Sequence, residues 1–150
     1  MDDIQELYHD TVMEHNRKPR NFRRLQKPSA TADGFNPLCG DQITLDLTVH
    51  DNIITEVGFV GAGCAISSAS ASLMTEAVNG KRIEEAQQLF EAFRVMLTRG
   101  VDIDYDIDLL GDLAALSGVT EFPVRIKCAT LCWHALHNAL DNTAGTATTE

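Results

Sequence analysis

The chain has 150 residues, of which 44% are hydrophobic, and its formal net charge is −10. This length fits one domain that buries a core without disulfide bonds. The acidic excess argues against binding to nucleic-acid phosphates, which requires clustered Lys and Arg. No stretch approaches the roughly 20 apolar residues of a membrane helix. We expect no nucleic-acid or membrane partner, and a cytoplasmic protein, because the N-terminus lacks the features of a signal peptide.

A first helix is predicted over residues 4–15, where apolar side chains recur every three to four positions, and it ends before Pro19. Half of the basic residues of the chain then follow within one short segment. They are Arg17, Lys18, Arg20, Arg23, Arg24 and Lys27. This basic segment is either a solvated connection or a docking surface for an acidic partner.

A small antiparallel sheet of about three strands is expected next. A short strand is predicted over residues 31–35. Residues 43–49 alternate between apolar and polar side chains, and Asp51-Asn52 separates them from a second run over residues 53–60. Alternation on both sides of a two-residue turn predicts a β-hairpin with one polar face. The sheet would act as a scaffold for loops.

Four helices are predicted after the sheet. They run from Cys64 to the Asn79-Gly80 pair, over residues 83–97, over residues 109–116, and from near Pro123 to about Leu140. The sequence therefore predicts an α+β fold in which the antiparallel sheet packs against helices. We expect a single domain over residues 1–141, followed by a flexible C-terminal tail over residues 142–150.

Three of the four cysteines occupy turns or helix starts. Cys39 begins a Cys-Gly-Asp motif, Cys64 begins a helix after a Gly-Ala-Gly turn, and Cys128 lies in the first turns of the last helix. In a reducing compartment such residues are more often free thiols, metal ligands or catalytic groups than disulfides. Together with Asp41 they make a tetrahedral zinc set or an iron–sulfur ligand set. Each cysteine taken alone also fits a small buried side chain.

The residues around the first two cysteines suit metal or thiolate chemistry. At a helix N-terminus, Cys64 is favoured as a thiolate by the helix dipole and the free amides. Gly61 and Gly63 are expected to adopt positive φ and to let the backbone approach a metal or substrate. Asp41 would be a hard ligand among soft sulfurs, which favours ligand exchange. Alternatively, Asp41 only caps the turn after Cys39.

The third cysteine has two basic neighbours and a second thiol nearby. Arg125 and Lys127 place positive charge beside Cys128, and this charge would stabilise a thiolate. Cys132 lies one helical turn beyond Cys128. It is either a fourth sulfur ligand or a small buried residue.

Three segments closely resemble motifs of the IscU/NifU N-terminal family of iron–sulfur cluster assembly proteins. They are Cys39-Gly40-Asp41, residues 61–67 and residues 122–131. The resemblance spans nearly the whole chain. It is strongest to the SufU branch, which carries an insertion between the second and third cysteines and a Lys where scaffold proteins have a His ligand. The long interval that includes residues 100–120 fits the insertion, and Lys127 occupies the His position.

The resemblance implies a zinc-dependent sulfurtransferase. Its implied partners are a PLP-dependent cysteine desulfurase of the SufS type, which donates persulfide sulfur, and downstream cluster-assembly or apo-proteins. Cys39, Asp41, Cys64 and Cys128 would hold the zinc. Cys39 would be the catalytic acceptor thiol, leaving the metal when a histidine of the desulfurase replaces it.

The alternative within the family is a non-enzymatic scaffold that assembles and delivers a [2Fe-2S] cluster on the same residues. Lys127 favours sulfur transfer, because it does not offer the nitrogen ligand of the scaffold branch, although Asp41 would complete an iron site as well as a zinc site. The resemblance implies that Arg125 helps to hold Asp41 or the released thiolate. Cys132 departs from the branch, in which we expect Ala.

Overall fold

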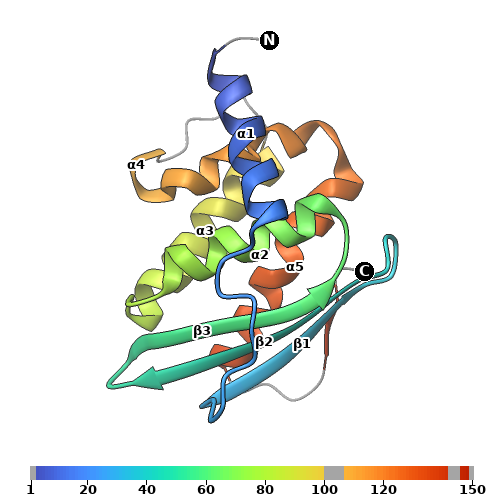
Figure 1. Ribbon diagram of the computed structural model, residues 1–150. Helices are drawn as coiled ribbons and strands as arrows, with labels where there is room; N and C mark the ends of the chain where they lie inside the picture. The colour runs from blue at the N-terminus through green and yellow to red at the C-terminus, as the bar shows by residue number, and fades with distance from the viewer. Residues whose placement is uncertain (1–2, 100–106, 142–145, 149–150) are drawn as a thin grey trace.

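The computed structural model describes residues 3–99, 107–141 and 146–148. The helices are α1 (Asp3–Arg17), α2 (Ala65–Val78), α3 (Ile83–Arg99), α4 (Ile107–Leu110) and α5 (Pro123–Leu140), with the 3-10 helix η1 (Gly111–Glu121) between the last two. The strands are β1 (Ala30–Asn36), β2 (Asp41–His50), β3 (Ile53–Ala62) and β4 (Thr146–Thr148). Figure 1 shows the helices gathered on one side of the sheet, with α2 and α5 in contact with its strands. This architecture confirms the predicted α+β class.

The sheet has the order β3-β2-β1-β4, and the first three strands are antiparallel. The β2–β3 hairpin turns at Asp51 and Asn52, whose φ angles are 51° and 66°. Two successive residues with positive φ match the twist of a two-residue hairpin turn, and Asp and Asn adopt this conformation more readily than most residues. The predicted hairpin is therefore confirmed, and its turn lies at the predicted pair.

The C-terminal region differs from the flexible tail that was expected over residues 142–150. Thr146–Thr148 form β4, which pairs in parallel with Asp33–Phe35 of β1. Residues 142–145 and 149–150 lie outside the described residues, as do residues 100–106 of the segment that fits the family insertion. The domain boundary at residue 141 stays a prediction.

The core lies between the sheet and the helices. Leu45 and Leu47 of β2 are fully buried beneath the helical layer. On α5, Trp133 stacks against Phe90 and Phe93 of α3, with ring centres 5.7 and 5.3 Å apart. Aromatic contacts of this kind bury large areas and fix helices relative to one another. No helix within the described residues has the length and apolar character needed to cross a membrane.

The helix predicted over residues 109–116 is mostly a 3-10 helix. The α-helical turn of α4 ends at Gly111, whose φ of 54° is the left-handed conformation that commonly terminates a helix. In η1, Leu113, Leu116 and Val119 are all buried. Their spacing of three residues matches the three residues per turn of a 3-10 helix, so one face of η1 points into the core.

The basic segment after α1 is tied to the sheet through Asp46, which is completely buried. Its carboxylate accepts hydrogen bonds from Arg24 Nε at 2.7 Å, Leu25 N at 3.0 Å and Thr31 Oγ1 at 2.7 Å. Burial raises the pKa of Asp46, but the hydrogen bonds from Arg24, Thr31 and Leu25 outweigh it and lower the pKa overall. Arg24 is thus part of the fold rather than a free docking group.

Two other segments lie along the outer edge of β3. At one end, Phe59 N donates a hydrogen bond to Asn21 O at 3.0 Å. At the other end, Ile54 N donates to Lys81 O at 2.8 Å, and Gly80 N donates to Ile54 O at 2.7 Å. These bonds fix the connection between α1 and β1 and the turn between α2 and α3 against the sheet.

Candidate metal centre

Three cysteines and one aspartate meet where the β1–β2 turn, the β3–α2 junction and α5 come together. The ligand atoms of Cys39, Asp41 and Cys128 all lie within 4.8 Å of one another. Cys128 Sγ is 3.5 Å from Cys39 Sγ, and Cys64 Sγ is 3.9 Å from Asp41 Oδ2. The structure therefore gathers Cys39, Asp41 and Cys128 into one group and places Cys64, the fourth residue that was predicted to hold a metal, beside Asp41.

The turn between β1 and β2 places Cys39 at its tip. Gly40 has a φ of 73°, in the left-handed region that glycine adopts at no steric cost. Its N–H donates a hydrogen bond to Asn36 O at 2.8 Å and closes the turn. Cys39 is exposed, whereas Asp41, which begins β2, is completely buried. The two residues of the Cys-Gly-Asp motif thus reach one centre from different surroundings.

The carboxylate of Asp41 is held against the backbone that precedes α2. Cys64 N donates to Asp41 Oδ1 at 2.9 Å, and Asn36 Nδ2 donates to Asp41 Oδ2 at 3.3 Å. A Cβ atom on Gly63 would lie 2.7 Å from Asp41 Oδ1. The expectation of positive φ at Gly61 and Gly63 was wrong, since neither adopts it. Gly63 instead allows this close approach.

Cys64 is the N-cap residue of α2, as its position after Gly63 predicted. Its backbone is extended, with φ −71° and ψ 170°, and its Sγ accepts a hydrogen bond from Ser67 N at 3.4 Å. The thiol is exposed. An N-cap position offers a negatively charged sulfur both a backbone donor and the positive end of the helix dipole.

Cys128 is the buried member of the group, with 2% of its surface exposed. Burial, and next the neighbouring Asp41, Cys39 and Cys64, raise the pKa of its thiol well above the ordinary value. A cation bound by the four groups would lower the pKa of Cys128 again, because its positive charge would offset the repulsion between the negatively charged groups. The arrangement favours a cation over four free acids.

The two basic residues near Cys128 differ from each other in their surroundings. The guanidinium Cζ of Arg125 lies 4.6 Å from the ring centre of Phe122. Lys127 is half-buried. Across the described segments, no hydrogen bond or ion pair joins either side chain to Asp41 or to a cysteine sulfur. Their supporting roles stay predictions.

The fourth thiol, Cys132, is buried in the contact between α5 and α2. Its Sγ lies 3.5 Å from Ser70 Oγ and 3.8 Å from Ala129 O, and 2% of its surface is exposed. Burial raises the pKa of Cys132 to about 12. These are the surroundings of a small buried side chain rather than of a fourth sulfur ligand.

A cavity of about 640 Å³ opens onto three of the candidate ligands, Cys39, Cys64 and Cys128. Its other walls come from α1, the first turn of α2 and the start of α5. They are His9, Val12, Met13, Ala65, Ile66, Phe122, Pro123, Val124 and Arg125. The periodicity of residues 4–15 predicted α1 but could not show that this helix borders the cysteine site, because that contact depends on the packing of the whole chain.

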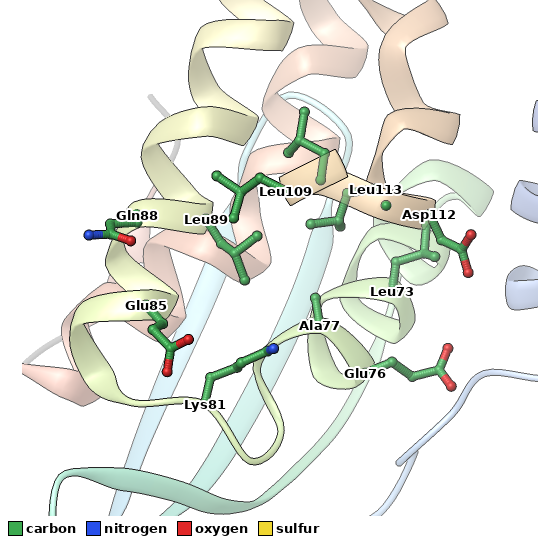
Figure 2. Close-up of a pocket in the computed structure, with 12 residues that line it drawn as sticks. Leu73, Glu76, Ala77, Lys81, Glu85, Gln88, Leu89, Leu109, Asp112 and Leu113 are labelled. Carbon is green, nitrogen blue, oxygen red and sulfur yellow. The ribbon is translucent and has the colours of Figure 1, made fainter. Parts of the chain in front are cut away.

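A second cavity, of about 410 Å³, lies between α2, α3 and the α4–η1 segment. Figure 2 shows its floor of Leu73, Leu89 and Leu113, with the carboxylates of Glu76 and Asp112 on one side. The described residues that line it include no cysteine or histidine. The chemistry therefore points to the cavity beside the cysteines.

Sequence reasoning missed Asn36. It is completely buried, and its Nδ2 donates to Asp41 Oδ2 at 3.3 Å and to Cys128 Sγ at 3.5 Å. The available signal was the Asn-Pro dipeptide just before Cys39, which is typical of turn initiation. That signal predicts the turn, but not that the side chain reaches a sulfur on α5.

The types of donor atom in this centre show which metal ions or clusters it could hold. Three sulfurs and one carboxylate oxygen match the tetrahedral coordination of zinc, which accepts Cys and Asp ligands together. Cysteine sulfurs are also the usual ligands of iron–sulfur clusters. The residues present therefore fit either group.

Two named proteins are similar to this chain over almost its whole length. The chain is 43% identical over 142 residues to the zinc-dependent sulfurtransferase SufU of Bacillus subtilis, covering 95% of each chain. It is 39% identical over 141 residues to the iron–sulfur cluster assembly scaffold protein IscU of Streptococcus pyogenes, covering 94% of this chain and 87% of that protein.

The fold and the family agree with these relatives. A crystal structure described as an iron–sulfur cluster assembly scaffold protein for the SUF system, from Fervidobacterium islandicum, superposes with a TM-score of 0.82. Its sequence is 29% identical, and the match covers 91% of this chain and 98% of that one. Residues 7–129 match the NifU-like N terminal domain, and this range contains all four candidate ligands. The chain therefore belongs to the NifU-like N-terminal domain family, as its motifs predicted.

Proposed function

We propose that this protein is a cytoplasmic, zinc-dependent sulfurtransferase of iron–sulfur cluster assembly. Zinc is held by Cys39, Asp41, Cys64 and Cys128, and Cys39 accepts persulfide sulfur from a cysteine desulfurase. The observation that carries the proposal is the contrast between an exposed Cys39 at a turn tip and its close neighbours Asp41 and Cys128, which are buried. Cys64 is exposed as well, but its Sγ accepts a hydrogen bond from Ser67 N at the start of α2. Cys39 is therefore the ligand that can leave while the other three stay in place.

Each part of the centre has a chemical role in this proposal. Zinc favours the thiolate form of its cysteine ligands, and a thiolate is the form that attacks sulfur. The thiolate of Cys39 attacks the outer sulfur of a persulfide on the desulfurase. The donor S–S bond breaks, the desulfurase thiolate leaves with the electron pair, and a new S–S bond forms at Cys39 Sγ. The transfer is neutral in electrons and needs no oxidant.

The surface around Cys39 suits a partner that brings a persulfide to the centre. Leu38, Phe122 and Val124 are 61%, 46% and 50% exposed, although all three are large apolar residues. Phe122 and Val124 border the cavity onto which the cysteines open. Exposed apolar side chains beside a reactive site mark a protein-binding surface. We assign this surface to a PLP-dependent desulfurase of the SufS type, with downstream cluster-assembly or apo-proteins as later acceptors.

The second candidate is a scaffold for a [2Fe-2S] cluster. The relative from Streptococcus pyogenes carries the name of a scaffold protein, and the same four residues would complete an iron site. Lys127 supports sulfur transfer over this alternative, because its ammonium group offers no lone pair to iron.

The test begins with protein purified without oxygen. We expect zinc, near one per chain, and no visible colour. We also expect a matched desulfurase to turn over cysteine much faster in its presence. Cys39→Ala should abolish this stimulation, whereas Cys132→Ala, which alters a thiol outside the centre, should retain it. A brown protein containing iron and sulfide, or full stimulation by Cys39→Ala, would contradict the proposal.

A further inference from the structure

Asn36 lies at the base of the loop that carries Cys39, and it connects that loop to two of the ligands. Its Nδ2 donates to Asp41 Oδ2 at 3.3 Å and to Cys128 Sγ at 3.5 Å. Its Oδ1 accepts from Leu38 N at 3.3 Å. The side chain is completely buried. One end of the amide therefore contacts the ligands, and the other end contacts the loop.

The four ligands differ in how firmly the fold holds them. Asp41 accepts hydrogen bonds from Asn36 and from Cys64 N, the latter at 2.9 Å. Cys64 is fixed as the N-cap of α2, and Cys128 is buried within α5. Cys39 is exposed, and the contact described for its Sγ is with another ligand, Cys128 Sγ, at 3.5 Å.

We propose that Asn36 is a positioning residue that keeps Asp41 and Cys128 directed at the metal while Cys39 leaves and returns. Hydrogen-bond donors behind metal ligands fix ligand orientation and tune affinity. Asn36 also accepts from Gly40 N through its backbone carbonyl, at 2.8 Å, and so closes the loop in which Cys39 moves. The exchange of Cys39 rests on the proposed function, whereas the orientation of Asp41 and Cys128 does not.

Two substitutions separate the contacts of Asn36. Asn36→Ser shortens the side chain beyond reach of the ligands, but its hydroxyl can still accept a hydrogen bond from the N–H two residues on. Asn36→Leu keeps the size of the side chain and removes both polar ends. The matched control is Ser70→Ala, which removes a buried hydroxyl whose contacts are to Cys132 Sγ and Ala129 O, outside the centre.

The measurements are Zn²⁺ affinity, by competition with a chromogenic chelator, and the visible spectrum of the Co²⁺-substituted protein. We expect both Asn36 variants to lose affinity by roughly 10- to 100-fold and to show altered Co²⁺ d–d bands. Ser70→Ala should keep the wild-type affinity and spectrum, even if its unfolding temperature falls. Circular dichroism of the metal-free proteins verifies folding, and if Asn36→Leu does not fold, Asn36→Ser provides the comparison with Ser70→Ala.

Wild-type affinity and spectrum in the folded Asn36 variants would overturn the inference. Equal losses in Ser70→Ala would also overturn it, because general destabilisation would then account for the effect. The assay is independent of sulfur transfer. A wild-type protein that binds Zn²⁺ but does not stimulate a desulfurase would contradict the proposed function and leave the positioning role of Asn36 intact.

Discussion

Asp41 approaches the backbone at residue 63 so closely that only glycine fits there. A Cβ atom at this position would lie 2.7, 3.1 and 3.2 Å from Oδ1, Cγ and Cβ of Asp41. The aspartate is completely buried and is also held by Cys64 N, so it has little freedom to move away. The orientation of the Asp41 carboxylate therefore depends on residue 63 having no side chain.

We predict that Gly63→Ala displaces the Asp41 carboxylate and weakens Zn²⁺ binding by about tenfold or more, the usual effect of disturbing the support of a ligand. Overpacking should also lower the free energy of unfolding of the metal-free protein by about 1–3 kcal/mol. Chelator competition and urea unfolding measure the two effects. Gly118→Ala is the control, because a Cβ there meets no atom within 4 Å. Undiminished affinity in Gly63→Ala would contradict the prediction.

At the scale of elements, α1 is attached to α2 through a buried histidine. His15 is 4% exposed, and its Nδ1 lies 2.7 Å from Ser72 Oγ. That hydroxyl also accepts a hydrogen bond from Arg20 N at 2.8 Å, and its own proton is available to Nδ1 of a neutral ring. In that tautomer Nε2 carries the ring proton, 3.6 Å from Glu76 Oε1. The neutral ring fits its surroundings.

We predict that this contact weakens as the pH falls. Burial, and next the charge of Arg20, lower the pKa of His15, although Glu76, Glu14 and Asp112 oppose the shift. The unfolded chain therefore binds the proton at a higher pH than the native protein does. The contribution of His15 to the free energy of unfolding should be complete above pH 6.5, the ordinary pKa of histidine. It should decline as the pH falls from there toward the lower pKa of the native state.

Urea unfolding of wild type and His15→Gln, from pH 8 to pH 5, measures this effect. The variant should be less stable at pH 8 by about 1–3 kcal/mol, because a buried partner loses its hydrogen bond. Its stability should depend less on pH than that of wild type. His134, whose pKa burial also lowers, is present in both proteins, so the difference between them reports His15. Parallel pH profiles would disprove the prediction.

The sequence predicted most elements because their signals are local. Apolar spacing was enough for α1, α3 and α5, and the Asp51-Asn52 pair was enough for the hairpin turn. The 3-10 helix η1 was predicted as an α-helix. Over so short a stretch, a repeat of three and a repeat of 3.6 residues differ little until one knows which side chains meet the core.

At the scale of the whole molecule, the centre joins parts of the chain that are far apart. Cys39 and Cys128 are 89 positions apart, yet their sulfurs lie 3.5 Å from each other. Motifs were enough to select the four candidate ligands, because each carries its own local signature. Asn36 and the α1 wall of the cavity were not predictable, since their roles arise from contacts across the fold.

Because the candidate metal-binding residues come from separate elements, removal of a bound metal should destabilise the whole fold. A metal present at 100 times its dissociation constant adds about 2.7 kcal/mol to the free energy of unfolding. For a chain of this size, that corresponds to roughly 5–10 °C in the unfolding midpoint. Calorimetry before and after chelation measures the change. Cys128→Ser should respond much less to added Zn²⁺, and equal midpoints for metal-bound and chelated wild type would refute the prediction.

The bonds along the outer edge of β3 bear on how the protein meets other molecules. A bare strand edge offers its N–H and C=O groups to any extended peptide, including a strand of a neighbouring copy. On β3, Asn21 and Lys81 already accept hydrogen bonds from Phe59 and Ile54. This edge is therefore a poor template for strand addition. Under the proposed function, a sulfur donor would therefore be bound through the side chains around the cysteines rather than by strand addition to β3.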